Sequence, residues 1–160
     1  MKSLHGELSD SKRYLFFFLE GERFGMDISF VQEIVRFQNC IPLPKAPDYF
    51  LGMMNLRGKN IPILHLAKRL GFSHEALHDH PVVILAKLQG KEAGLLVDRV
   101  DEVGGVGEEI LSQGTIHSLC ETFTQGIAKD QHLQKAVILL KTEALLEDLA
   151  LDTKQTTSPL

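Results

Sequence analysis

Hydrophobic residues along this chain gather in short runs that are separated by glycines and polar clusters. Pairs of apolar runs flank Gly21-Glu22, residues 57–60 and residues 89–91, a pattern that predicts three β-hairpins. Two further strands are expected between residues 119 and 141, the second of them in "AVILLK". Many short strands at close spacing indicate small β-barrels rather than a sheet built from βαβ units.

Helical periodicity is confined to short segments. "HLAKRLGF" predicts a short helix stopped by Gly71, and "SFVQEIVRF" fits either one helical turn capped by Ser29 or a strand throughout. Near the C-terminal end, "TEALLEDLAL" predicts an amphipathic helix with Thr142 as its N-cap. The apolar face of that helix consists of Leu145, Leu146 and Leu149.

Two segments predict irregular structure. "NCIPLPKAPDYF" holds three prolines and is expected to be a loop, because proline cannot donate a hydrogen bond inside a central strand. "DEVGGVGEEIL" is rich in glycine and is expected to be bent. Its "GGVG" does not meet the G-x-G-x-x-G spacing of a phosphate-binding loop, so a turn is favoured there.

Composition narrows the class of protein. The 160 residues are 44% hydrophobic and 24% charged, which predicts a globular chain of one ordinary domain or two very small ones. The net charge of −4, with no basic stripe, argues against nucleic-acid binding. The polar N-terminal residues predict no signal peptide, and a cytoplasmic location is expected. Cys40 and Cys120 are expected to be buried free thiols rather than a disulfide.

The pattern H-E-x-x-H occurs once, from His74 to His78, and is the sharpest catalytic signal in the chain. A zinc protease needs this pattern inside a substantial helix, together with a third ligand. Only about two helical turns fit between Gly71 and Pro81 at 1.5 Å of rise per residue. A solvated connector is therefore favoured over a catalytic zinc site, and adventitious metal binding by His74, His78 and His80 stays open. We expect no enzyme, metal or cofactor.

A resemblance makes the function more specific. "GMMNLRGKNIPILHL", residues 52–66, resembles the signature of the CheW family of chemotaxis coupling proteins, in which a glycine and two apolar residues precede N-L-R-G and an apolar-Pro-apolar strand follows. "YLFFFLEGERFGMDISFVQEIV" resembles the opening hairpin and V-x-E-I segment of the family, and "AGLLVDRVDEV" resembles a later block. Together these motifs extend from about Tyr14 to Leu149.

The resemblance implies a mainly β fold of two intertwined, five-stranded, SH3-like β-barrels with short helices and a C-terminal helix. It implies a CheW-like domain over residues 12–150, with polar flexible tails at 1–11 and 151–160. The implied function is that of a non-enzymatic adaptor. Its implied partners are the regulatory domain of a CheA-type histidine kinase and the cytoplasmic tip of a chemoreceptor, with membrane contact only through the receptor.

The resemblance also points to site residues. The matched coupling segment contains Val31 and Glu33, and the matched N-L-R-G strand and turn contain Gly52, Asn55, Arg57 and Gly58. Gly58 can supply the positive φ of a tight turn, and Asn55 can hydrogen-bond the turn backbone. Glu33 is the expected carboxylate partner of Arg57. Val31 fits core packing as well as coupling, and Leu95 and Val97 fit either core packing or a receptor groove between the barrels.

The chain departs from the family pattern in a few positions. His65 stands where the family usually has Asp, and Lys59 and Asn60 replace residues that are commonly apolar. These departures leave open a CheW-like paralogue of a pilus-motility or other chemosensory pathway. A generic SH3-like peptide-binding module is a further alternative, but the absence of Trp and the presence of only two Tyr disfavour its aromatic groove. No two-domain coupling protein of the CheV type is expected.

Overall fold

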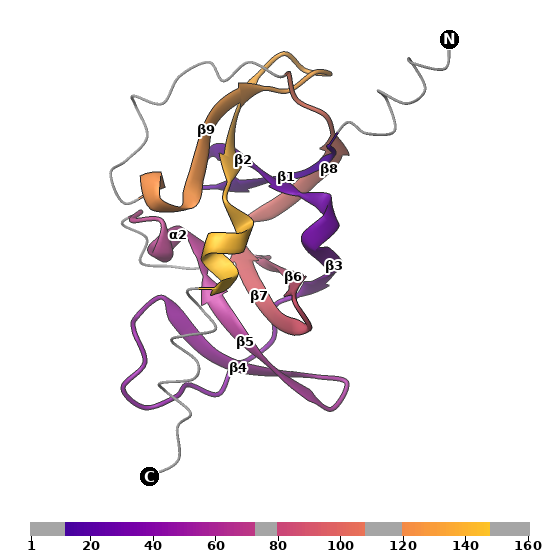
Figure 1. Cartoon of the computed structure of the whole chain (residues 1–160). Helices are drawn as coiled ribbons and strands as arrows, with labels where there is room; N and C mark the ends of the chain where they lie inside the picture. The colour runs from indigo at the N-terminus through magenta and orange to yellow at the C-terminus, as the bar shows by residue number, and fades with distance from the viewer. Residues whose placement is uncertain (1–11, 73–79, 108–119, 148–160) are drawn as a thin grey trace.

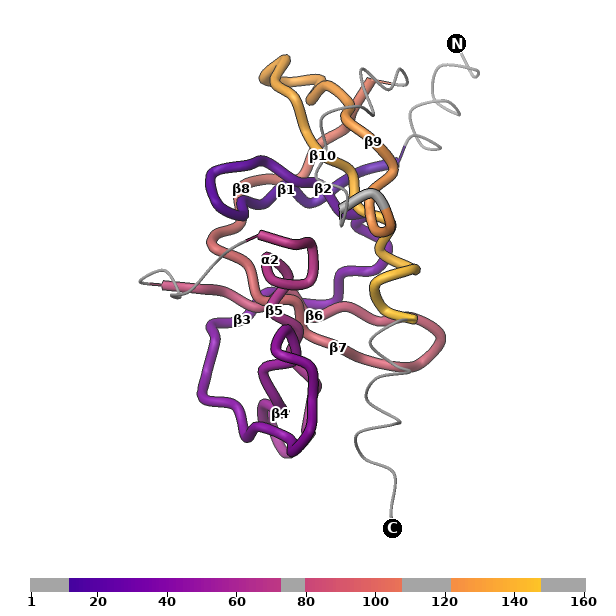
Figure 2. Tube along the Cα trace, turned by 90° about the vertical axis from the view of Figure 1, so that its left-hand side faces the viewer, coloured from indigo at the N-terminus to yellow at the C-terminus, as the bar shows by residue number. Residues whose placement is uncertain are grey.

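The computed structural model describes residues 12–72, 80–107 and 120–147, and these residues form two five-stranded sheets (Figure 1). The first sheet has the order β8-β1-β2-β10-β9 and the second has the order β3-β6-β7-β5-β4. In Figure 2 the first sheet lies at the top and the second below it, with the short helix α2 between them. The number of strands in each sheet agrees with the expectation from the sequence.

The two sheets draw on different parts of the chain. The first sheet contains β1 (Tyr14–Leu19), β2 (Glu22–Asp27), β8 (Arg99–Gly104), β9 (Thr124–Lys129) and β10 (Ala136–Leu140). The second contains β3 (Val31–Arg36), β4 (Phe50–Leu56), β5 (Lys59–His65), β6 (Val82–Leu88) and β7 (Lys91–Val97). Because β1 and β2 precede the whole second sheet while β8 to β10 follow it, the sheets are intertwined. The parallel neighbours β2–β10 and β5–β7 join strands that are distant in sequence.

Three hairpins share one kind of turn. Each turn has only two residues, an ordinary residue followed by glycine, and both residues have positive φ, as type I′ turns require. The turns are Glu20-Gly21, Arg57-Gly58 and Gln89-Gly90. The first turn therefore lies one residue earlier than the sequence predicted, and the other two are shorter. Lys59, Asn60 and Lys91 belong to strands instead, because the paired register continues to the residue next to each turn.

The short helices follow the sequence closely except at their caps. The 3-10 helix η1 (Ile28–Phe30) leads directly into β3, so only the first two residues of "SFVQEIVRF" belong to a helical turn, and the strand runs from Val31 to Arg36. Its cap is Asp27, whose carboxylate accepts a hydrogen bond from the Ser29 N–H at 2.9 Å, so the expectation that Ser29 is the cap was wrong. Helix α2 (Leu66–Arg69) ends before Gly71, which has a φ of 96°. This end agrees with the prediction.

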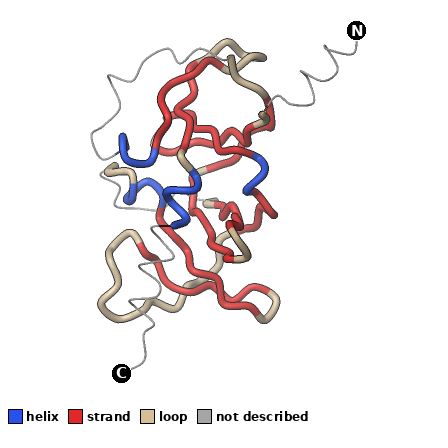
Figure 3. The backbone as a smooth tube through the Cα atoms, viewed as in Figure 1, coloured by secondary structure: helices blue, strands red, loops and turns tan. Residues whose placement is uncertain are grey.

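The C-terminal part of the described chain is helical over residues 142–147 (blue in Figure 3). Thr142 is already helical and its buried hydroxyl has no hydrogen-bond partner, so Thr142 is not the cap that was expected from the sequence. Leu145 and Leu146 are buried, as predicted, and Leu149 lies outside the described residues. The remaining 3-10 helix η2 (Cys120–Phe123) precedes β9.

The glycine-rich segment after β7 is more regular than expected. Its first part forms β8, which pairs with β1 from Arg99 to Gly104, with a register shift opposite Leu15 and Phe17. Beyond β8, Val106 forms a bridge with Asp130. The Gly107 N–H also donates to the Lys129 carbonyl at 2.9 Å. These contacts join the residues after β8 to the last residue of β9 and the residue that follows it, so they connect the two edges of the first sheet.

The core has a shared part and a separate part inside each sheet. Along β1, Leu15, Phe17 and Leu19 pack into the shared core, whereas Tyr14 and Phe16 pack on the other face of the sheet. The second sheet likewise has a group of buried residues that is separate from the shared core and forms the interior of that sheet. That interior is built from Met54, Ile61, Ile63, Val83, Leu85 and Leu96. Burial of both faces explains why β1 and β6 are apolar runs rather than alternating sequences.

Helix α2 and residues 142–147 fill the space between the sheets, contributing Leu66, Ala67 and Leu145 to the shared core. Within the described parts of the chain, none of the helices combines the length and the apolar character that crossing a membrane requires.

Candidate functional site

The N-L-R-G motif forms the tip of the β4–β5 hairpin. Arg57 and Gly58 are its two turn residues, with φ of 54° and 85°, which confirms the positive φ predicted for Gly58. Asn55 does not bond the turn backbone as expected. Its amide Nδ2 instead donates to Oδ1 of Asn60 at 3.3 Å, because the two residues face each other across the antiparallel pair. The tip is exposed and held by side-chain contacts.

Arg57 makes a two-pronged contact with Glu33, the partner that was predicted from the sequence. Its Nη1 lies 2.9 Å from Oε1 and its Nη2 lies 2.6 Å from Oε2. The hydrogen bond from Arg57 lowers the pKa of the Glu33 carboxyl, and the same contact raises the pKa of Arg57. Parallel N–H···O bonds of this kind fix the geometry of both groups.

This pair connects the two edges of the second sheet. Glu33 lies on β3, one edge strand, and Arg57 follows β4, the other edge strand. The Arg57 side chain is 69% exposed, so it presents its charge to solvent while its position is fixed by Glu33. An exposed charge held in one orientation can recognise a partner without the cost of ordering it first.

Val31 and Gly52 are two further residues of the predicted coupling site. Val31 is half-buried and packs against the shared core, so both of the roles predicted for it stay open. Gly52 has a φ of 132°, and a Cβ there would overlap the Ile41 carbonyl oxygen. Glycine at this position therefore has a backbone reason independent of any partner.

Leu95 and Val97 are core residues. Leu95 is fully buried and Val97 is 1% exposed, and both belong to the shared core. Of the two predicted roles, the structure supports core packing. The groove interpretation is not supported, because neither side chain reaches the surface.

The histidine cluster lies mostly outside the described residues, which include exposed His80 but not His74 or His78. Within the described ranges no three His, Cys, Asp or Glu side chains come together in a way that could hold a metal ion. Cys40 is a free thiol, half-buried, and burial raises its pKa to about 11.

Two further surface features, each in contact with β4 or β5, were not found by sequence reasoning. The Lys59 Nζ lies 2.7 Å from Oε1 of Glu92, across 33 residues of sequence that no local pattern bridges. Ile41 is 69% exposed although its backbone exchanges two 2.8 Å hydrogen bonds with Met53. An isoleucine that directly precedes a proline carries no sequence signal for such a position.

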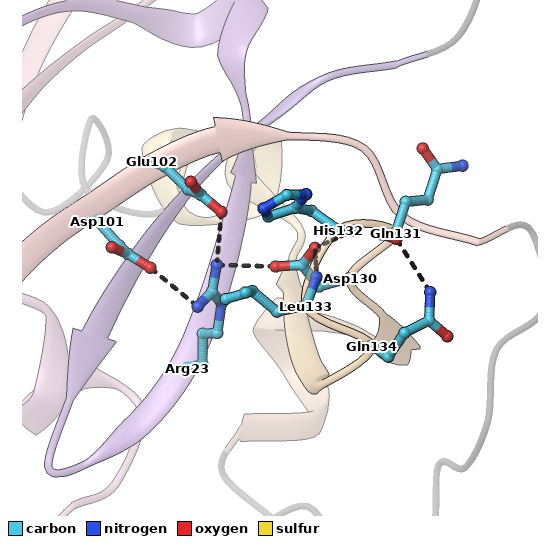
Figure 4. Close-up of polar contacts among 8 residues, drawn as sticks. All are labelled: Arg23, Asp101, Glu102, Asp130, Gln131, His132, Leu133 and Gln134. Atoms are coloured by element: carbon cyan, nitrogen blue, oxygen red, sulfur yellow. Dashed lines mark hydrogen bonds and ion pairs between the residues drawn. The ribbon is translucent and has the colours of Figure 1, made fainter.

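A third feature, also missed, lies in the first sheet. Figure 4 shows the Arg23 guanidinium between carboxylates on two sides, with Asp130 at 2.8 Å and Asp101 at 2.9 Å. The other oxygen of Asp130 accepts the backbone N–H groups of His132 at 2.7 Å and Leu133 at 3.1 Å. Arg23 and Asp130 are both buried, so this cluster stabilises the fold and offers little surface to a partner.

Comparison with known proteins assigns the chain to a family. The family model of the CheW-like domain matches residues 13–150, nearly the whole chain. The chain belongs to the CheW-like domain family. It is similar to the probable chemotaxis protein CheW of Rhizobium etli, with 34% identity over 88% of this chain and 92% of that protein. It is also 27% identical to the chemotaxis protein CheW of Thermotoga maritima, over 93% and 96% of the two chains.

A solved structure supports the same assignment. The CheW scaffolding protein from Thermoanaerobacter tengcongensis matches with a TM-score of 0.72 and 33% identity, over 82% of this chain and 89% of that chain. The mainly β, two-sheet fold expected from the sequence is therefore confirmed as a CheW fold. The N-L-R-G tip and the Glu33–Arg57 pair of this CheW-like domain are its candidate functional site.

Proposed function

We propose that this chain is a non-enzymatic adaptor of chemotaxis-type signalling that couples chemoreceptor tips to a CheA-type histidine kinase. The observation that carries the proposal is the Glu33–Arg57 pair, which holds an exposed guanidinium at the tip of the family's N-L-R-G hairpin. Family membership and similarity to chemotaxis and scaffolding proteins support this function. The adaptor acts in the cytoplasm, through surfaces rather than through catalysis.

The proposed coupling interface contains Val31, Glu33, Gly52, Asn55, Arg57 and Gly58. Glu33 and Arg57 supply charge and geometry, and Gly52 and Gly58 supply the backbone that presents them. Ile41 adds an exposed apolar surface beside Gly52. A central apolar contact with a polar surround is the usual arrangement of a specific protein interface.

The proposed domain extends over residues 12–150, with tails at 1–11 and 151–160. Individual contacts of such an adaptor are modest, and they become firm when several receptors, kinases and adaptors bind at once. The adaptor reaches the membrane only through its receptor.

A binding assay tests the function. The full chain is titrated with the regulatory domain of the CheA-type kinase from the same organism, and separately with a receptor cytoplasmic fragment. Wild type is compared with Arg57→Ala and with Arg13→Ala, a matched loss of an exposed arginine next to the other sheet. We expect saturable binding to at least one partner, weakened by Arg57→Ala and unchanged by Arg13→Ala.

Two results would contradict the proposal. Absence of binding to both partners would reject the coupling function for this chain. Equal binding by wild type and Arg57→Ala would mean that the interface lies away from the tip. The exchange Arg57→Glu with Glu33→Arg restores the pair in reverse, so partial rescue relative to Arg57→Glu alone would assign the role to the geometry of the pair.

A further inference from the structure

The β4–β5 tip is held by a second ion pair besides the Glu33–Arg57 pair. Lys59, the first residue of β5, places its Nζ 2.7 Å from Oε1 of Glu92 on β7. The side chain of Glu92 is only 20% exposed, whereas the Lys59 side chain is 70% exposed. The hydrogen bond from Lys59 lowers the pKa of Glu92, and Lys87 adds to this effect. The contact therefore joins the mostly buried carboxylate of Glu92 to the end of the exposed Lys59 side chain.

The two ion pairs connect the tip to strands on its two opposite sides. Arg57 reaches β3, the far edge of the sheet, and Lys59 reaches β7, the parallel neighbour of β5. Only Gly58 separates the two cationic residues, and it has the φ of 85° that gives a two-residue turn its shape. Because the two residues lie so close in sequence, a rotation of the tip that breaks one ion pair also displaces the residue that forms the other.

A further contact holds the hairpin next to this ion pair. Asn60, which follows Lys59, accepts a hydrogen bond from Nδ2 of Asn55 across the hairpin at 3.3 Å. An uncharged residue at position 59 could not form an ion pair with Glu92. The second ion pair therefore depends on the lysine side chain itself.

We propose that Lys59 is a positioning residue of the coupling site: by binding Glu92 it fixes the twist of the β4–β5 tip and so keeps the Arg57 guanidinium on Glu33, ready for a partner. This inference rests on the proposed function for its binding consequence, but its structural part concerns this chain alone. Lys59 acts through Arg57 and does not itself have to touch the partner.

The first test needs no partner. The carboxyl titration of Glu33 is followed by NMR in wild type, in Lys59→Met and in the control Lys87→Met, which removes a second lysine that lowers the pKa of Glu92 but lies on β6, outside the tip hairpin. Methionine keeps an unbranched stem of similar length. We expect the pKa of Glu33 to rise toward its ordinary value in Lys59→Met and to stay low in Lys87→Met. An unchanged Glu33 titration in Lys59→Met would overturn the proposal, whatever the protein binds.

The second test uses the kinase regulatory domain and the receptor fragment. We expect Lys59→Met to raise Kd by about twofold to fivefold, the range of an exposed ion pair. The exchange Lys59→Glu with Glu92→Lys is expected to restore both the low Glu33 pKa and the wild-type Kd. If the exchange restored the Glu33 titration but not binding, Lys59 would touch the partner directly and the positioning role would be wrong. If wild type bound neither partner, the proposed function would fail, while the Glu33 titration would still decide the structural part.

Discussion

At the scale of single residues, two glycines with positive φ have different surroundings. A Cβ at Gly58 would meet open space, whereas a Cβ at Gly52 would overlap the carbonyl oxygen of Ile41 and lie 2.9 Å from Cα of Pro42. We expect Gly58→Ala to cost about 1–2 kcal/mol, the penalty of the left-handed conformation. Gly52→Ala should cost clearly more, because backbone must also move.

Urea unfolding of both variants measures this difference. Equal losses of unfolding free energy would mean that the 40–43 segment shifts easily. Such a result would remove the close approach to Ile41 as the reason for glycine at position 52.

Cys40 is expected to be a slow nucleophile. Burial raises its pKa to about 11, so almost no thiolate is present at neutral pH, and the thiolate is the reactive form. Alkylation of Cys40 by iodoacetamide, followed by peptide mass mapping, should be much slower at pH 7.5 than that of a free cysteine. A rate equal to that of free cysteine would show that the thiol is not buried in solution.

Leu95 and Ile34 test the assignment of core and surface. Leu95 is fully buried in the shared core and Ile34 is 42% exposed on β3. Leu95→Ala should lower the free energy of unfolding by about 2–5 kcal/mol, whereas Ile34→Ala should change it little. A small effect of Leu95→Ala on stability, with a large effect on receptor binding, would restore the groove interpretation.

For single residues, the sequence predicted which side chains have a special role better than it predicted which residues they contact. The Glu33–Arg57 pair and the turn glycine Gly58 were predicted and are present. The partner of Asn55 was not predicted, because the hydrogen bond of Asn55 depends on which residue faces Asn55 across the hairpin. Lys59–Glu92 was missed for the same reason: contacts between strands depend on register, which a one-residue change in turn length alters for every pair.

At the scale of secondary-structure elements, the Arg23 cluster connects β2 with β8 and with the turn that follows β9. Asp130 is 1% exposed, pairs with Arg23 and accepts two backbone N–H groups, whereas Asp101 is 34% exposed and pairs with Arg23 from the other side. Removing one partner of a buried ion pair costs about 3–5 kcal/mol. We expect Asp130→Asn to destabilise by an amount near that range and Asp101→Asn by much less.

Thermal unfolding and hydrogen exchange of β8 and β9 amides check this order. The Asp130→Asn variant should lose protection at the Gly107 amide, which bonds the Lys129 carbonyl beside the cluster. Equal effects of the two substitutions would mean that burial of Asp130 adds nothing to the stability that its ion pair provides.

Elements themselves were well predicted where pattern and turn chemistry agree. All three hairpins, helix α2 and the last two strands of the described chain were expected, and the helical turn of η1 was one of two alternatives left open by the sequence. The errors fall at boundaries. Two of the X-Gly turns are shorter than predicted and the first lies one residue earlier. Strand β8 was missed because the glycines at and after its end indicate a bend, although pairing with β1 makes it a strand. The cap of η1 was misplaced because Asp27, two residues earlier, competes with Ser29.

At the scale of the whole molecule, the order of strands could not be read from periodicity. The parallel pairs β2–β10 and β5–β7 join segments with no local connection, and a hydrophobic pattern shows that a strand is buried, not which strand it neighbours. The intertwined arrangement was expected only through resemblance to a family. The apolar runs of β1 and β6 fit burial on two faces, and the shared core between the sheets accounts for one of them.

In both sheets polar contacts connect residues at the two edges, and for the second sheet this gives a prediction for acid. There the contact is the Glu33–Arg57 pair, in which the pKa of Glu33 is lowered. A carboxyl whose pKa falls on folding stabilises the folded state above its unfolded pKa, about 4.3 for glutamate. That stabilisation is lost as the pH falls through the lower, folded pKa. The pair is therefore fully formed at neutral pH and weakens only in acid.

Comparison of wild type with Glu33→Gln isolates this contribution. Glutamine has nearly the same size but no charge to titrate, so the difference in unfolding free energy between the two proteins should be constant from about pH 8 to about pH 5. Below about pH 4 it should shrink, because protonated Glu33 then resembles glutamine. A difference that stayed constant down to the acid range would mean that Glu33 stabilises the sheet by packing rather than by charge. The edge-to-edge ion pair would then serve recognition alone.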